Sequence, residues 1–166
     1  MVTALAATVA VVLGGGVWLG SIVRSSESAV PFAARDWVLI TAFDNRTGEP
    51  LLDSTLEVAF ERELSASSYV NVVPRERVND ALVQMRKPVD SRVDGALGRE
   101  VAVRDGAIRA VIVGDVQQNG GTYTITANIV APRTGSIAAT VTEQTRNSAE
   151  IQPAVRRAAL RMRELL

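Results

Sequence analysis

An uninterrupted apolar segment at residues 2–23 limits what the rest of the chain can fold into. It reads VTALAATVAVVLGGGVWLGSIV and contains no charged side chain. As a helix it would span about 33 Å, which matches the roughly 30 Å hydrocarbon core of a bilayer. We therefore expect residues 1–23 to form a transmembrane helix, residues 24–35 (RSSESAVPFAAR) a linker, and residues 36–166 a single domain.

Two other interpretations of this segment stay open. A cleaved signal peptide would begin with positive charge and carry a shorter apolar stretch, whereas here Met1 precedes the segment directly. A buried helix of a soluble domain would rarely be this long. Arg24 and Glu27 follow the segment without a basic cluster, so the flanking charges do not fix its orientation.

The residue types that are missing exclude much of enzyme chemistry. The 166-residue chain contains neither cysteine nor histidine. A cysteine nucleophile, a Ser-His-Asp triad, a histidine base and a Cys/His zinc site are therefore impossible, while carboxylate-only sites survive. The 18 basic and 18 acidic residues balance, so no net field recruits nucleic acid. We expect a protein that is not an enzyme and that has no catalytic, cofactor-binding or metal-binding residues.

Apolar runs and helical periodicity alternate in the first part of the domain. Residues 37–43 (WVLITAF) and 69–73 are short apolar runs typical of buried strands. Between them, residues 51–67 place apolar side chains on one stripe of a helix. These side chains are Leu52, Leu56, Ala59, Phe60 and Leu64. Two further short helices are predicted over residues 75–85 and 94–104, separated by a loop that contains Pro88.

The second part predicts an antiparallel meander followed by a helix. Residues 108–116 (IRAVIVGDV) give the strongest strand signal, and Asn119-Gly120-Gly121 suits a tight hairpin. Residues 122–130 then alternate polar and apolar side chains, as a half-buried strand does. A third strand over 136–145 and a helix over 150–166 complete the order β-α-β-α-α-β-β-β-α. We expect an α+β or α/β fold in which helices pack on a single mixed sheet of about five strands.

Four stretches of this domain follow one another over about residues 37–145: WVLITAFDNRTGEP, VNVVPRERV, the run from ALGREVAVRDG to NIVAPRTG, and the closing strand. In this order and spacing they resemble the TolB-like amino-terminal domain of bacterial signalling proteins. The chain departs from the family before Phe43, where the usual proline is absent, and after Gly135, where an aromatic residue is usual. The resemblance implies a non-catalytic binding or sensing domain, which in this family often follows a kinase region and a membrane helix and precedes tetratricopeptide repeats. The final RMRELL, which has no helix-capping glycine, fits a piece of such a protein.

The candidate ligand or partner loop follows the first predicted strand and contains Asp44, Asn45, Arg46 and Glu49. Loops at the carboxyl ends of strands are where α/β sheets bind ligands. The alternative is ordinary turn and helix-capping chemistry, which we favour because it explains the same residues.

Two charged helix faces are weaker candidates. Glu57 and Glu61 share one helical face, with Glu63 nearby, but a solvated face explains them as well. The last helix carries Arg156, Arg157, Arg161 and Arg163. These arginines could contact lipid head groups or a partner, although a solvated face is again the simpler interpretation.

These observations favour a non-catalytic interaction or sensor domain tethered to the membrane by residues 2–23. We expect a protein partner, no nucleic acid, and a single-pass inner-membrane protein whose domain lies outside the cytoplasm, as a fragment of a serine/threonine kinase with repeats would place it. The alternative is a structural subunit of an envelope secretion or flagellar accessory complex. An enzyme that uses only carboxylates and arginines is a third hypothesis, without a visible pair of acids to carry it.

Overall fold

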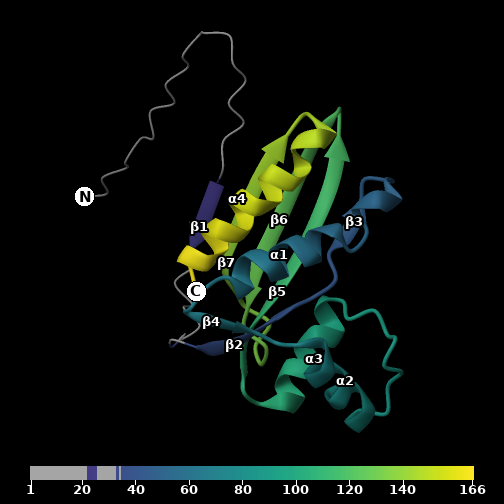
Figure 1. Cartoon of the computed structure of the whole chain (residues 1–166), viewed down its shortest axis with the longest axis vertical. Coiled ribbons are helices and arrows are strands. Elements are labelled where there is room, and N and C mark those ends of the chain that lie inside the picture. The colour runs from purple at the N-terminus through teal and green to yellow at the C-terminus, as the bar shows by residue number, and fades with distance from the viewer. Residues whose placement is uncertain (1–21, 26–32, 34) are drawn as a thin grey trace, which may run out of the picture.

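The computed structural model describes residues 22–25, 33 and 35–166, and Figure 1 shows how their helices and strands are arranged. The strands in this part of the chain are β1 (Ile22–Ser25), β2 (Asp36–Ile40), β3 (Asp44–Arg46), β4 (Val70–Val72), β5 (Ile108–Asn119), β6 (Thr122–Val130) and β7 (Ile137–Thr145). The helices are α1 (Thr55–Ser65), α2 (Arg75–Gln84), α3 (Gly95–Asp105) and α4 (Ile151–Glu164). Apart from β3, the predicted order of helices and strands is confirmed from β2 to α4.

All described strands join one mixed sheet, in which six follow the order β1-β7-β6-β5-β2-β4 and β3 pairs with β5. β2 lies between β4 and β5 and runs parallel to both, whereas β5, β6, β7 and β1 pair antiparallel. Gly120 and Gly121 have φ of +56° and +78°, which lets the β5–β6 connection turn within two residues. The parallel half of the sheet therefore adjoins a long antiparallel meander.

The two faces of the sheet bury separate apolar clusters because side chains alternate along the strands. Val38 and Ile40 of β2 point to the face covered by α1 and α4, where Phe60 lies 4.9 Å from Phe43 between ring centroids. Leu39 points to the other face, which α2 and α3 cover. The helices thus cover both faces of the parallel half, as in doubly wound folds.

Helix α3 approaches the sheet closely at Gly98. A Cβ on Gly98 would lie 2.4 Å from Thr41 Cγ2, inside van der Waals contact. Thr41 is fully buried, and its Oγ1 donates a hydrogen bond of 3.0 Å to the Ile112 carbonyl. Asp94 caps the helix start by accepting from the Leu97 amide at 2.8 Å, and Gly106 ends the helix with φ of +78°.

The structure differs from the sequence prediction in two elements of the domain. The helix predicted over residues 51–67 is interrupted because Ser54 has φ of +63°, so a short 3-10 helix (Pro50–Leu52) precedes α1. The predicted turn after β2 contains a strand, β3, which pairs with β5 beyond the end of β2. Backbone hydrogen bonding to an already formed β5 is a long-range effect that local turn residues do not reveal.

The start of the sheet also differs from the prediction. Ile22–Ser25, expected as the end of a membrane helix and the start of a linker, form β1 and pair with β7 from Ile22↔Thr142 to Ser25↔Ala139. The rest of the predicted membrane helix, residues 1–21, lies outside the described residues. No helix in the described part of the chain is both long and apolar enough to cross a bilayer.

Candidate functional site

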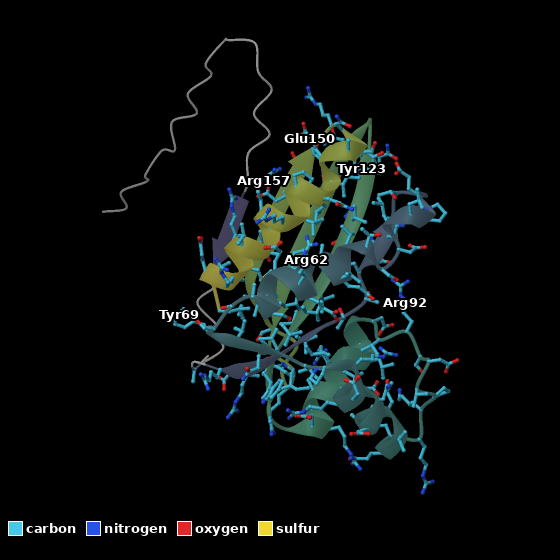
Figure 2. The ribbon with its side chains drawn as sticks, in the orientation of Figure 1. Arg62, Tyr69, Arg92, Tyr123, Glu150 and Arg157 are labelled. Atoms are coloured by element: carbon cyan, nitrogen blue, oxygen red, sulfur yellow. The ribbon has the colours of Figure 1, made fainter. Side chains whose placement is uncertain are left out.

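A cleft of about 540 Å³ opens beside the carboxyl ends of β2 and β4. Its floor comes from residues at and after these strand ends, including Ile40, Phe43 and Val73. One wall is α1, and the opposite wall is the loop between α2 and α3, where Figure 2 labels Arg92. This is the position at which α/β sheets bind ligands, because loops diverge there and leave a crevice.

Helix α1 turns two carboxylates toward this cleft. Its apolar stripe (Leu56, Phe60 and Leu64) packs into the core, which leaves Glu57 and Glu61 one turn apart on the flank that lines the cleft. Burial raises the pKa of Glu57, and repulsion from Glu61 raises it further, while Arg92 and Arg75 act in the opposite direction. Burial likewise raises the pKa of Glu61, opposed by Arg75.

Two arginines face the acidic helix from the other wall. Arg75 follows β4 and donates from Nη2 to the Val89 carbonyl at 2.8 Å. Arg92 donates from Nη2 to the Phe43 carbonyl at 2.6 Å, which fixes the α2–α3 loop against the end of β2. Neither arginine forms an ion pair with Glu57 or Glu61 in the described part of the chain.

The cleft is therefore suited to binding charged groups of both signs. Its charged side chains retain free hydrogen-bonding capacity, and Arg75 and Arg92 are each held by one hydrogen bond to a backbone carbonyl. Ser54 and Ser91 also line it, but the chain has no histidine to activate a serine hydroxyl. Among the described residues, no group of three or more acidic side chains is placed to hold a metal ion.

The loop predicted from the sequence, Asp44, Asn45, Arg46 and Glu49, does not line the cleft. Asn45 Oδ1 accepts from the Thr47 amide at 3.0 Å, and Asn45 Nδ2 donates to the Glu49 carbonyl at 2.8 Å. Arg46 pairs with Asp44 at 2.7 Å. These hydrogen bonds within the loop are of the turn-stabilising kind that we favoured from the sequence over a ligand site. A ligand role for the loop stays a prediction.

Glu49 is the member of this loop that reaches the rest of the sheet. Its carboxylate accepts a hydrogen bond from the Tyr123 hydroxyl of β6, and this bond raises the pKa of Tyr123. Figure 2 labels Tyr123 near the hairpin end of the sheet. Glu49 therefore ties the loop after β3 to the meander.

Sequence reasoning passed over Glu57 and Glu61 as a solvated face. Two signals could have identified them. They flank the apolar stripe of the helix that follows the first strand, and an arginine, Arg75, directly follows the Pro74 that ends the second strand. Both features place charge near the carboxyl ends of neighbouring parallel strands.

The basic face of α4 is largely occupied within the domain. Glu143 of β7 is buried, with 2% of its side chain exposed, and it accepts from Arg157 at 3.1 Å and lies 3.3 Å from Arg161. Arg156 lies 3.5 Å from Glu63 of α1. These contacts join α4 to β7 and α1, so three of the four arginines stabilise the fold rather than form a free basic surface.

Comparisons with known proteins give a fold and no family. No family model matches the sequence, and neither does any curated protein. Several solved structures match in three dimensions. The fold is shared with the C-terminal domain of LpoB. The Escherichia coli domain superposes with a TM-score of 0.62 and 16% identity, covering 70% of this chain and 87% of that one.

Two other solved structures align with this chain over a larger share of their own length. The PelC dodecamer from Paraburkholderia phytofirmans matches with a TM-score of 0.52 and 18% identity, over 88% of this chain and 97% of that one. Lipoprotein GNA1162 from Neisseria meningitidis matches with a TM-score of 0.52 and 18% identity, over 76% and 96%. These likenesses support the fold of helices on a mixed sheet that the order of elements predicted, but not the kinase context that the TolB-like resemblance implied.

Proposed function

We propose that this chain is a non-catalytic, membrane-tethered interaction domain whose cleft receives a segment of a protein partner. The observation that carries the proposal is the pair of carboxylates, half-buried Glu57 and exposed Glu61, which line the cleft and form no ion pair within the described part of the chain. Removing water from an ionised group costs free energy unless another charge or a hydrogen-bond donor replaces it. A lysine or arginine side chain of the partner would supply that replacement.

The charges on the two walls also determine which side chains we expect in the bound segment of the partner. Arg75 and Arg92 stand across the cleft from the two glutamates, so the segment carries acidic or carbonyl groups on its other side. Apolar floor residues such as Phe43 and Val73 favour a segment with at least one apolar side chain. Charges of both signs arranged in this way favour one register of the bound segment over others.

The membrane tether belongs to the same proposal. Residues 2–21 precede β1 directly, and as a helix they would still span about 30 Å. The fold neighbour GNA1162 is itself described as a lipoprotein, which supports a tethered arrangement for this fold. We place the domain outside the cytoplasm, where it would act as the interaction or sensor part of a signalling protein.

Affinity capture from crosslinked membranes tests the proposal. The full chain and its E57R/E61R variant are compared by quantitative mass spectrometry, with E164R on the exposed end of α4 as the matched control. We expect one or a few proteins to be enriched with the unmodified chain and with E164R, and to be lost with E57R/E61R. Turnover of nucleotides or phosphoesters by the purified chain would overturn the non-catalytic proposal.

A second candidate function is a subunit of a closed envelope assembly. The observation in its favour is the match to PelC, which was solved as a dodecamer and is covered over 97% of its length. Sedimentation of the full chain in a non-ionic detergent distinguishes the two. A discrete large oligomer of this chain alone supports the assembly, whereas a monomer that needs a different protein supports the interaction domain.

A further inference from the structure

A second charged surface lies at the end of the sheet opposite the β5–β6 hairpin. Its four arginines come from three places in the chain: Arg99 and Arg104 from α3, Arg109 from the start of β5, and Arg133 from the turn between β6 and β7. Figure 1 shows α3 and the start of β5 together at the end of the molecule away from the hairpin tip. We call these four residues the arginine surface.

Three of these arginines have no partner of opposite charge. Arg104, Arg109 and Arg133 are exposed and form no ion pair or side-chain hydrogen bond among the described residues. Arg99 is held in place because its Nε donates to the Pro132 carbonyl at 3.2 Å. The surface therefore presents three arginine charges that no ion pair within the described residues neutralises.

The acidic residues close to this surface are already paired elsewhere. Glu100 lies 3.0 Å from Lys87, and Asp105 receives two hydrogen bonds from Arg77, at 2.6 and 2.7 Å. The hydrogen bond from Arg77 lowers the pKa of Asp105, so this carboxylate stays ionised and bound to its partner. The positive charge of the arginine surface is consequently not neutralised by its neighbours.

An apolar groove runs between the arginines. It consists of two adjoining hollows of about 530 and 160 Å³ that share Val103, Pro132 and Arg133. Val103 of α3 is apolar and yet 47% exposed. Met85 adds a flexible apolar side chain to the first hollow. A ligand that fits this groove has an apolar side chain flanked by negative charge.

From this charge and shape we infer that the arginine surface docks an acidic segment of a protein partner, with one apolar side chain seated against Val103 and Pro132. Arginine suits carboxylates because its planar guanidinium donates two parallel hydrogen bonds. This surface shares no lining residue with the cleft, so the inference does not depend on a ligand at Glu57 and Glu61; only the choice of a protein segment over lipid rests on the proposed membrane tether.

The direction of the chain favours a protein segment over a lipid surface. The chain enters β1 at Ile22, which lies opposite Thr142 near the carboxyl end of β7. The arginine surface lies at the other end of these strands, where Val130 of β6 leads into the turn before β7. A membrane tether placed before β1 would therefore turn the arginine surface away from the bilayer.

Fluorescence anisotropy with defined peptides tests the inference. The full chain in a non-ionic detergent is titrated into a labelled glutamate-rich peptide that carries a single leucine. The matched peptides replace glutamate by glutamine, or leucine by serine. We expect R104E, R109E and R133E each to weaken binding by about two- to fivefold, and the triple variant by more than about tenfold. V103S should weaken binding of the leucine peptide alone.

The control variant is R146E: Arg146 is exposed just after β7 and forms no ion pair among the residues that the structure describes. Equal loss of affinity with R146E would overturn the inference, as would equal binding of the glutamine peptide. Vesicles of anionic phospholipid form a separate arm. If they bind through the three arginines while the acidic peptide does not, the surface recognises lipid and the inference is wrong. Unfolding midpoints establish that each variant is folded. Where a charge-reversal variant does not fold, the corresponding arginine-to-glutamine variant is used in its place.

Discussion

Replacing Gly98 by alanine tests how tightly α3 is packed on the sheet. In an isolated helix, alanine is favoured over glycine by about 1 kcal/mol, so helix propensity alone predicts a more stable protein. In this fold the added Cβ would lie 2.4 Å from Thr41 Cγ2, where carbon atoms normally stay about 3.5–4.0 Å apart. The two effects have opposite signs, and the packing determines which is larger.

The packing effect should win because Thr41 cannot move aside cheaply. Rotating its side chain would break the buried hydrogen bond to the Ile112 carbonyl, which costs about 1–3 kcal/mol. Moving the helix instead would disturb a close-packed interface at a similar cost. After the gain in helix propensity is subtracted, we expect G98A to lower the free energy of unfolding by roughly 1–2 kcal/mol.

Urea unfolding of the full chain, followed by circular dichroism, measures this effect against a control and a rescue. Gly95 begins the same helix, and its added Cβ would lie 2.9 and 3.2 Å from the two Val113 methyl carbons, a smaller overlap than at Gly98, so G95A should cost less than G98A. The substitution T41S removes Cγ2 and keeps the hydroxyl. We expect G98A to be neutral or stabilising in the T41S background, a coupling of about 1–2 kcal/mol. A G98A variant as stable as the unmodified chain, or a double variant whose effects simply add, would refute the reasoning.

Three further predictions concern stability and its dependence on pH. Because burial raises the pKa of Glu57, ionising this carboxyl costs more free energy in the folded chain than in the unfolded one. E57Q should therefore stabilise the fold at neutral pH and have no effect below the ordinary pKa of 4.5. The same substitution should weaken capture of the partner. An E57Q chain that is less stable at neutral pH in urea titrations would count against this account. The lowered pKa of Asp105 has the opposite sign, so D105N should cost roughly 1–2 kcal/mol at neutral pH, and the loss should shrink as pH falls from 3.8 through the lowered pKa. If D105N lowers the free energy of unfolding by the same amount at every pH, the hydrogen bond between Asp105 and Arg77 is not the cause of the loss. F60A removes a fully buried ring packed on Phe43 and should cost about 3–5 kcal/mol by the same assay; a loss below about 1 kcal/mol would mean the core tolerates the cavity.

The sequence predicted the elements whose signal is local. The apolar stripe of α1 and the alternation of β6 appear in the structure because one face of each element is buried and the other is not. The hairpin at Gly120 and Gly121 follows from backbone conformations that glycine adopts without strain. The four helices and the strands β2, β4, β5, β6 and β7 were therefore predictable.

The elements that the sequence missed depend on distant partners. β3 exists because Asp44–Arg46 pair with the far half of β5, and β1 exists because Ile22–Ser25 pair with β7. The cleft has the same origin. Glu57 lines it because α1 packs across the end of β2. The α2–α3 loop, which lies more than thirty residues later in the sequence, forms the other wall. No local pattern records that approach.

Site-specific photocrosslinking on membranes shows whether the cleft binds a protein partner. A benzophenone side chain is placed at Ser91, which lines the cleft, and separately at Val83, which is 62% exposed on α2 and lies outside it. If the partner lies in the cleft, position 91 gives a discrete adduct with one other protein, which is absent from position 83 and abolished by E57R/E61R. Adducts of equal yield from both positions, or an adduct from position 91 that survives the charge reversal, would contradict it.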